Sequence, residues 1–387
     1  MPEPYRYISP DPVASATGTP ALVFAQSRRE LGAPFAPHLM AAPDLHAATW
    51  SLLRESMLAG AAPRARKEAV ALAVAVANRC PFCIDAHGVL LHATGSHRLA
   101  RAVLRGEPPD DPADAALIGW ATGSRPFPAG AAPLAGGAAP LPGGAASLPG
   151  GAASLPGGAA PSPAGAVPFP AGETAEFVGT VLVNHFINRM VDALRPGSIL
   201  PSLPGPAGDV VVSPLRRLAG AALSRRVRRP VRPGDSLRLL GRAAAGGSPA
   251  WARDNPFIGT AYAAFRTAAH RGGDLLSEDA REVVAGVVEG WDGGHPAIGS
   301  DWPGRLLGDV ELEERPAVRL VLLAAIAPYR LTDVAVGAWR GGVEQGEDGR
   351  LVRLLAFGAI TAVDKIAAGL AVGGEPQPCE TARQRSA

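Results

Sequence analysis

The 387-residue sequence predicts an all-α protein with two helical lobes joined by a disordered linker rich in proline, glycine and alanine. Candidate helices begin at capping residues or have proline in their first turn. Residues 70–76 alternate as a strand would, but their alanines favour a helix. Residues 125–171 contain a seven-residue repeat, PLPGGAA and close variants, in which proline and glycine oppose regular structure. The predicted domains are a first lobe at 1–124, the linker at 125–171 and a second lobe at 172–387.

The first lobe is expected to contain five helices, each marked by its first residues. Their predicted ranges are 44–58, 63–78, 81–93, 96–104 and 112–121. The expected N-caps are Asp44, Ser96 and Asp111, and the prolines that fit first turns are Pro63, Pro81 and Pro112. This lobe is therefore predicted to be entirely helical.

The second lobe is predicted to be helical on the same grounds. Its candidate helices are 174–194, 259–270, 278–291, 313–327, 333–340 and 351–370, with Ser277 and Thr332 as caps. Residues 195–256 are rich in proline and arginine and are expected to be extended or irregular. A polar patch lies inside the otherwise apolar first helix of this lobe. Its His185 and Asn188 are expected to belong to an interhelical network or, alternatively, to line a substrate pocket.

Composition limits the partners and the compartment. A net charge of +2 gives no general attraction to nucleic acid or anionic membranes. The nine arginines between Arg216 and Arg242 have no aromatic residues among them, so solvated or interdomain roles are expected. No apolar run suits a signal peptide or a membrane span, which predicts a cytoplasmic protein. Three cysteines are too few for a disulfide framework, so a close pair indicates redox chemistry or metal binding.

Two of these thiols, Cys80 and Cys83, stand three residues apart, and His87 follows one turn later. If the chain turns near Asn78, antiparallel packing of the two flanking helices places Glu68 level with His87. The predicted row is therefore Glu68, His87, Cys83 and Cys80. Asp85, on the same segment, is expected to face solvent.

This order of residues has a chemical rationale. A free thiol with a pKa of about 8.5 is mostly protonated at neutral pH, and a helix N-terminus and an imidazole both favour the thiolate. His87 would act as base and Glu68 would orient it. Cys83, nearest His87, would attack a peroxide and become a sulfenic acid, and Cys80 would condense with it to a disulfide. An external dithiol must then reduce the pair.

The run from Glu68, EAVALAVAVANRCPFCIDAHGVLLHATG, resembles the alkylhydroperoxidase D-like (AhpD-like) members of the carboxymuconolactone decarboxylase superfamily. LLAAIAPYRLTDVAVGAWR, at 322–340, is similar to the C-terminal helices of double-length members. The resemblance implies an AhpD-like helical fold, peroxide as substrate, an external dithiol or thioredoxin-like reductant, and homo-oligomers. It implies no metal and no organic cofactor. Phe82 stands where some members have a histidine, and the second lobe lacks a cysteine pair, which predicts one active centre and a degenerate second half.

Alternative interpretations remain open for the cysteine pair. A closed zinc site needs four ligands, and only His87 lies near. A glutaredoxin-like centre would need strands, and a structural role would leave both thiols as small buried hydrophobes. For the whole protein, the alternatives to a peroxidase or disulfide oxidoreductase are a decarboxylase-like lyase and a non-catalytic redox sensor or scaffold.

Overall fold

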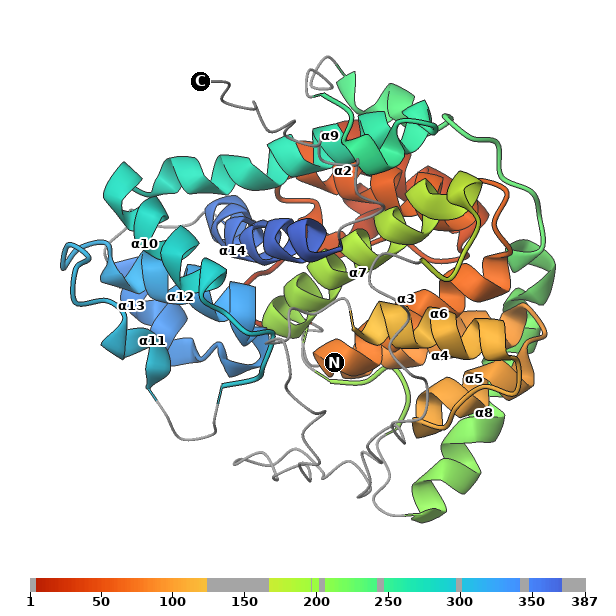
Figure 1. Cartoon of the computed structure of the whole chain (residues 1–387). Coiled ribbons are helices and arrows are strands. Elements are labelled where there is room, and N and C mark those ends of the chain that lie inside the picture. Colours follow the sequence, from red (N-terminus) through yellow and green to blue (C-terminus); the bar gives the residue numbers. More distant parts are fainter. Residues whose placement is uncertain are drawn as a thin grey trace, which may run out of the picture.

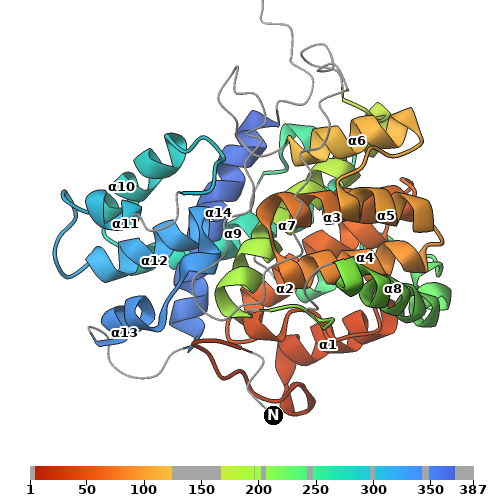
Figure 2. The ribbon, with the colours of Figure 1, turned by 90° about the horizontal axis from the view of Figure 1, so that it is seen from below.

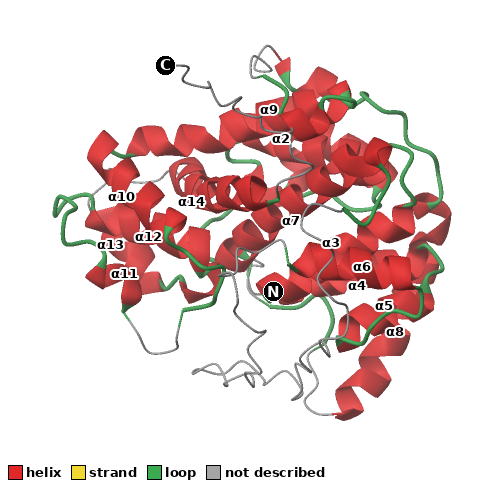
Figure 3. Ribbon diagram, in the orientation of Figure 1, coloured by secondary structure: helices red, strands yellow, loops and turns green. Residues whose placement is uncertain are grey.

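The computed structural model describes residues 5–123, 167–195, 197–201, 206–241, 247–296, 301–341 and 348–370. Across these ranges the regular structure is helical and no strand occurs (Figure 3). The predicted all-α class is therefore confirmed. The repeats of the predicted linker lie outside the described residues.

Among the residues that the structure describes, the first half of the chain forms six α-helices and a π-helical turn. They are α1 (Gly18–Glu30), α2 (Pro43–Leu53), η3 (Arg54–Leu58, the π-helical turn), α3 (Arg64–Asn78), α4 (Pro81–Ala93), α5 (His97–Arg105) and α6 (Pro112–Thr122). The segment 70–76, which alternates like a strand, lies in α3 and is helical and largely buried on all sides. Asp111 caps α6 as predicted, because its side chain accepts a hydrogen bond from the amide of Ala113.

The second half adds eight α-helices. They are α7 (Thr174–Leu194), α8 (Pro206–Val227), α9 (Pro256–His270), α10 (Glu278–Glu289), α11 (Trp302–Arg305), α12 (Arg315–Ile326), α13 (Asp333–Gly341) and α14 (Asp348–Gly369). Short 3-10 turns connect several of them, including η4 (Ala171–Glu173) and η9 (Pro328–Arg330). Among the described helices, none is long and apolar enough to cross a membrane.

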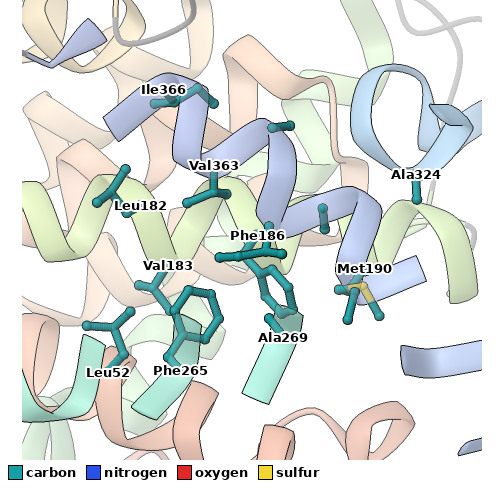
Figure 4. Packing of buried hydrophobic residues seen from close by; sticks show 14 of the residues in the cluster. Leu52, Leu182, Val183, Phe186, Met190, Phe265, Ala269, Ala324, Val363 and Ile366 are labelled. Carbon is teal, nitrogen blue, oxygen red and sulfur yellow. The ribbon is translucent and has the colours of Figure 1, made fainter. Parts of the chain in front are cut away.

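Helix α7 runs through the middle of the molecule. In Figures 1 and 2 it lies between the orange helices α3 to α6 of the first half and the blue helices α12 to α14. It packs against α3 on one side and against α14 on the other. Its Phe186 meets Phe265 of α9 edge to face, with ring centroids 4.8 Å apart, beside Val363 of α14 (Figure 4). One continuous cluster of buried apolar side chains therefore includes both predicted lobes.

Three helices were not expected from the sequence, among them the four-residue α11. Helix α1 precedes the first predicted element, and α8 occupies much of the segment 195–256 that was expected to be irregular. Pro214 lies inside α8, and the helix packs along α4, where a side chain at Gly220 would meet His92 and the backbone of Val89. The expectation of an irregular segment was wrong because packing against α4 outweighs the low helix propensity of its glycines and proline.

The packed chain resumes before the predicted end of the linker. Phe169 lies within the range 125–171, yet it is buried and its ring lies 4.9 Å from that of Trp120 and 4.8 Å from that of Phe177. These aromatic contacts attach the start of the second half to α6 and α7. The last residues of the predicted linker therefore belong to the folded structure.

Candidate active site

The candidate site lies at the turn between α3 and α4. Helix α3 ends at Asn78, and Arg79 adopts a left-handed conformation with φ of 59° that reverses the chain. Cys80 is the N-cap residue of α4, and Pro81 occupies the first helical position, where a missing amide proton costs no intrahelical bond. This geometry places Cys83 in the first turn of α4.

Glu68 and His87 meet across this hairpin. A hydrogen bond of 2.9 Å joins Nδ1 of His87 to Oε2 of Glu68, which is fully buried. The other oxygen of Glu68 accepts hydrogen bonds from Arg64, one turn earlier, at 2.8 and 2.5 Å. Burial alone would raise the pKa of Glu68, but Arg64 and His87 together hold it below its ordinary value. A carboxylate therefore fixes the imidazole, and Arg64 is a supporting residue that the sequence analysis missed.

The two thiols are adjacent and enclosed. Their sulfur atoms lie 2.7 Å apart, with Cys80 donating to Cys83, and Cys80 is 0% and Cys83 3% exposed. Burial raises the pKa of both. The pKa of Cys80 rises further because of its proximity to Cys83, whereas the hydrogen bond from Cys80 lowers that of Cys83. The pKa of Cys83 is therefore raised less than that of Cys80.

The structure thus forms two contacting pairs, Glu68 with His87 and Cys80 with Cys83. In the part of the chain that the structure describes, no hydrogen bond joins His87 to Cys83, although the two lie one turn apart on α4. The Nε2 atom of His87 makes no hydrogen bond to a described residue, so it is available to accept a proton. The burial of the thiols also opposes the activation expected from the helix N-terminus.

The second half of the chain contributes to the site through the end of α7. Val191 packs in one small apolar cluster with both cysteines, and the carboxyl group of Asp192 lies near the Cys80 thiol and interacts with it electrostatically. The guanidinium of Arg195 lies 4.2 Å from the ring centroid of Phe82, between the two cysteines in sequence. Its positive charge lowers the pKa of Cys83. Asp192 and Arg195 were both missed by sequence analysis.

The polar patch of α7 lies beside this region. Nδ1 of His185 is hydrogen-bonded at 3.0 Å to the amide of Asn78, so His185 takes part in an interhelical network. Asn188 is fully buried, and both polar atoms of its amide lack a hydrogen-bond partner among the described residues. A role for either residue in binding substrate stays a prediction.

A small cavity lies where the two halves meet near the thiols. Its wall includes Asn78, Arg189, Asp192, His295, Ile326 and Tyr329. Neither His185 nor Asn188 is part of this wall. Five of these six wall residues follow residue 171, so the second half forms most of this cavity, and Asn78, two residues before Cys80, is the contribution of the first half.

Asp85 was expected to face solvent, and this expectation was wrong. The side chain is buried, and one oxygen accepts hydrogen bonds from Arg216 of α8 at 3.1 and 2.6 Å. Its other oxygen accepts from the hydroxyl of Ser198 and the amide of Leu200. The segment after α7 therefore covers α4, and this burial could not be foreseen without α8.

Comparison with known proteins places this helical hairpin in a family. Residues 43–105, which span α2 to α5, match the model of the carboxymuconolactone decarboxylase family. The chain is also more than 30% identical to a curated relative over nearly its whole length. The chain therefore belongs to the carboxymuconolactone decarboxylase family. That relative, from Mycobacterium tuberculosis, is named alkyl hydroperoxide reductase Rv2159c. It is 34% identical over 380 residues, which cover 96% of each chain. The predicted family is therefore confirmed.

Proposed function

We propose that this protein reduces hydroperoxides through a dithiol–disulfide cycle of Cys80 and Cys83. The observation that carries the proposal is the hairpin geometry, in which a buried thiol pair lies one turn from an imidazole held by Glu68. The similar chain from Mycobacterium tuberculosis bears the name of a reductase of alkyl hydroperoxides, which agrees with this chemistry.

Cys83 is the attacking thiol in this proposal. Its thiolate takes the terminal oxygen of the hydroperoxide, the O–O bond breaks, and the alkoxide leaves as an alcohol after gaining a proton. His87 accepts the thiol proton through Nε2 and returns it to the leaving oxygen, while Glu68 stabilises the imidazolium. Arg195 favours the thiolate electrostatically.

Cys80 is the resolving thiol. It attacks the sulfenic acid on Cys83, which releases water and forms the disulfide, and their adjacent sulfur atoms permit this reaction without a change of fold. An external dithiol or a thioredoxin-like protein then reduces the disulfide, because no further described cysteine lies nearby. Residues of this chain suffice for both steps, so the proposal includes no metal or organic cofactor.

The test is peroxide consumption by the full chain with dithiothreitol as reductant. A Cys379→Ser background leaves only the thiol pair, and this variant should retain full turnover. Adding Cys83→Ser should abolish turnover. Adding Cys80→Ser should, when dithiothreitol is left out, permit one turnover and leave a sulfenic acid on Cys83. Full turnover by the Cys83→Ser variant would refute the assignment.

The family name suggests a second candidate, a decarboxylase-like lyase that would not require a thiol pair. The two candidates predict opposite results for a chain that lacks both Cys80 and Cys83. A lyase would keep its activity on a lactone carboxylate, whereas the proposed peroxidase would lose all activity. Disulfide formation after one equivalent of peroxide without further turnover would instead indicate a sensor.

A further inference from the structure

We infer that Asp192, from the second half of the chain, is the general base for the resolving thiol Cys80. The inference rests on the proposed function only in calling Cys80 the resolving thiol. It concerns the attack of Cys80 on the sulfenic acid of Cys83. The sequence motif offers no base for this step, because His87 and Glu68 lie nearer to Cys83 than to Cys80 along the hairpin.

The position of Asp192 carries the argument. The residue lies on the last turn of α7, next to Val191, which packs against both cysteines; its carboxyl group lies near the Cys80 thiol, and it forms part of the wall of the cavity between the halves. The carboxyl is buried, and its Oδ2 has no hydrogen-bond partner among the described residues. A structural carboxylate would be expected to use both oxygens, so one oxygen here is free to take part in proton transfer.

The electrostatic surroundings suit a base of this kind. Burial raises the pKa of Asp192 to about 8, although the neighbouring Cys80 thiol and the positive charge of Arg189 oppose the shift. That value approaches the pKa of an ordinary thiol, and general-base catalysis is most effective when the pKa of the base lies near the working pH. A solvent-exposed aspartate would be too weak a base for this role.

The step balances without another reactant. As the sulfur of Cys80 attacks the sulfur of the Cys83 sulfenic acid, its proton passes to Asp192 and the S–S bond forms. The S–O bond breaks, and Asp192 returns the proton to the leaving hydroxide, which becomes water. The sulfur of Cys80 is oxidised and that of Cys83 is reduced, and Asp192 ends as the carboxylate with which it began.

A polar strip along α7 leads to this carboxylate. Thr180, Asn184 and Asn188 precede Asp192 at intervals of four residues, so the four share one face of the helix. Each is buried, and each has at least one polar side-chain atom without a hydrogen-bond partner among the described residues. The face that presents Asp192 to Cys80 is therefore polar along several turns, and a polar surrounding lowers the cost of ionising a buried carboxyl.

The experiment separates the two steps of the cycle. Reduced protein is mixed with one equivalent of hydrogen peroxide, and samples are quenched with a dimedone-type probe for sulfenic acid and a reagent for free thiols. In Asp192→Asn, the sulfenic acid should form on Cys83 at least as fast as in the wild type, because Asp192 raises the pKa of Cys83, but the disulfide should form about 100-fold more slowly, as expected for loss of a general base. Asp192→Glu should recover part of this loss.

A second measurement does not depend on peroxide chemistry. An aromatic disulfide reagent such as dithiobis(nitrobenzoate) forms a mixed disulfide with Cys83, and attack by Cys80 then releases a second coloured thiolate. This second release should also be slow in Asp192→Asn. If it is slow while the wild type consumes no peroxide, Asp192 keeps its role and only the proposed peroxidase activity fails.

The control is Asp44→Asn, which neutralises a carboxylate paired with Arg353 and Arg271, away from the thiols. It should leave both steps unchanged. Wild-type rates of disulfide formation and of second release in Asp192→Asn would overturn the inference. An equal slowing of sulfenic acid formation and disulfide formation would overturn it too, because a merely structural change affects both steps.

Discussion

The raised pKa of Asp192 makes a quantitative prediction about stability. In the folded protein burial raises this pKa to about 8, from an ordinary value of 3.8. Between these two values the native state binds one more proton than the unfolded state, so the free energy of unfolding falls as the pH rises. The slope attributable to Asp192 is about 1.4 kcal/mol per pH unit.

Asp192→Asn removes this titration. Between pH 5 and pH 7, the wild type should lose about 2.7 kcal/mol of stability that the variant does not lose, because the variant carries no ionisable group at this position. The asparagine amide does not titrate, so any effect it has on absolute stability is the same at every pH, and the informative quantity is the difference in slope. This difference does not depend on whether Asn packs as well as Asp.

The assay is urea unfolding followed by circular dichroism at several pH values across this window. Asp44→Asn is the matched control, since Arg353 and Arg271 hold the pKa of Asp44 below its ordinary value against the effect of burial. Asp44 is ionised in both states above about pH 5, so its replacement should shift stability by a constant amount. Parallel slopes for the wild type and Asp192→Asn would refute the raised pKa.

Two further predictions concern the contacts that join the halves. Glu176→Gln leaves the buried ammonium of Lys67, 2.6 Å away, without its counter-charge and should destabilise the protein by about 3–5 kcal/mol. A thermal melt measures this, and a loss below 1 kcal/mol would contradict it. Gly220→Ala places a methyl group 2.9 Å from Cβ of His92 and should cost about 1–3 kcal/mol in urea unfolding. Gly119→Ala, with no atom within 4 Å, should instead stabilise its helix, and equal effects of the two glycine substitutions would disprove the packing argument.

Sequence patterns were sufficient for most helices because their ends carry local signals. Asp111 and Ser277 form the capping hydrogen bonds expected of them, and Pro81 begins α4. The contact between Glu68 and His87 was predictable for the same reason, because a turn at Asn78 fixes which residues of two antiparallel helices lie level. Local chemistry and regular geometry determine all of these features.

The parts that sequence analysis missed depend on contacts between distant segments. Helix α8 contains Pro214 and glycines, so its propensity is poor, and it is stabilised by packing against α4 and by the pair of Arg216 with Asp85. Asp192 likewise gave no local signal of its own. The sequence does contain one clue: Asp192 follows Asn184 and Asn188 at intervals of four residues, so it continues the polar patch of α7.

The central position of α7 explains why the second half matters to a site whose motif lies in the first. At one end of this helix Glu176 pairs with Lys67 of α3, and Arg195 follows its other end, about 28 Å away at 1.5 Å per residue. That second end acts on both thiols, because Asp192 raises the pKa of Cys80 and of Cys83, whereas Arg195 lowers that of Cys83 alone. In the proposed cycle, the difference between attacking and resolving thiol therefore comes partly from Arg195, beyond the end of a helix that carries no cysteine, so the second half is expected to influence which sulfur reacts first.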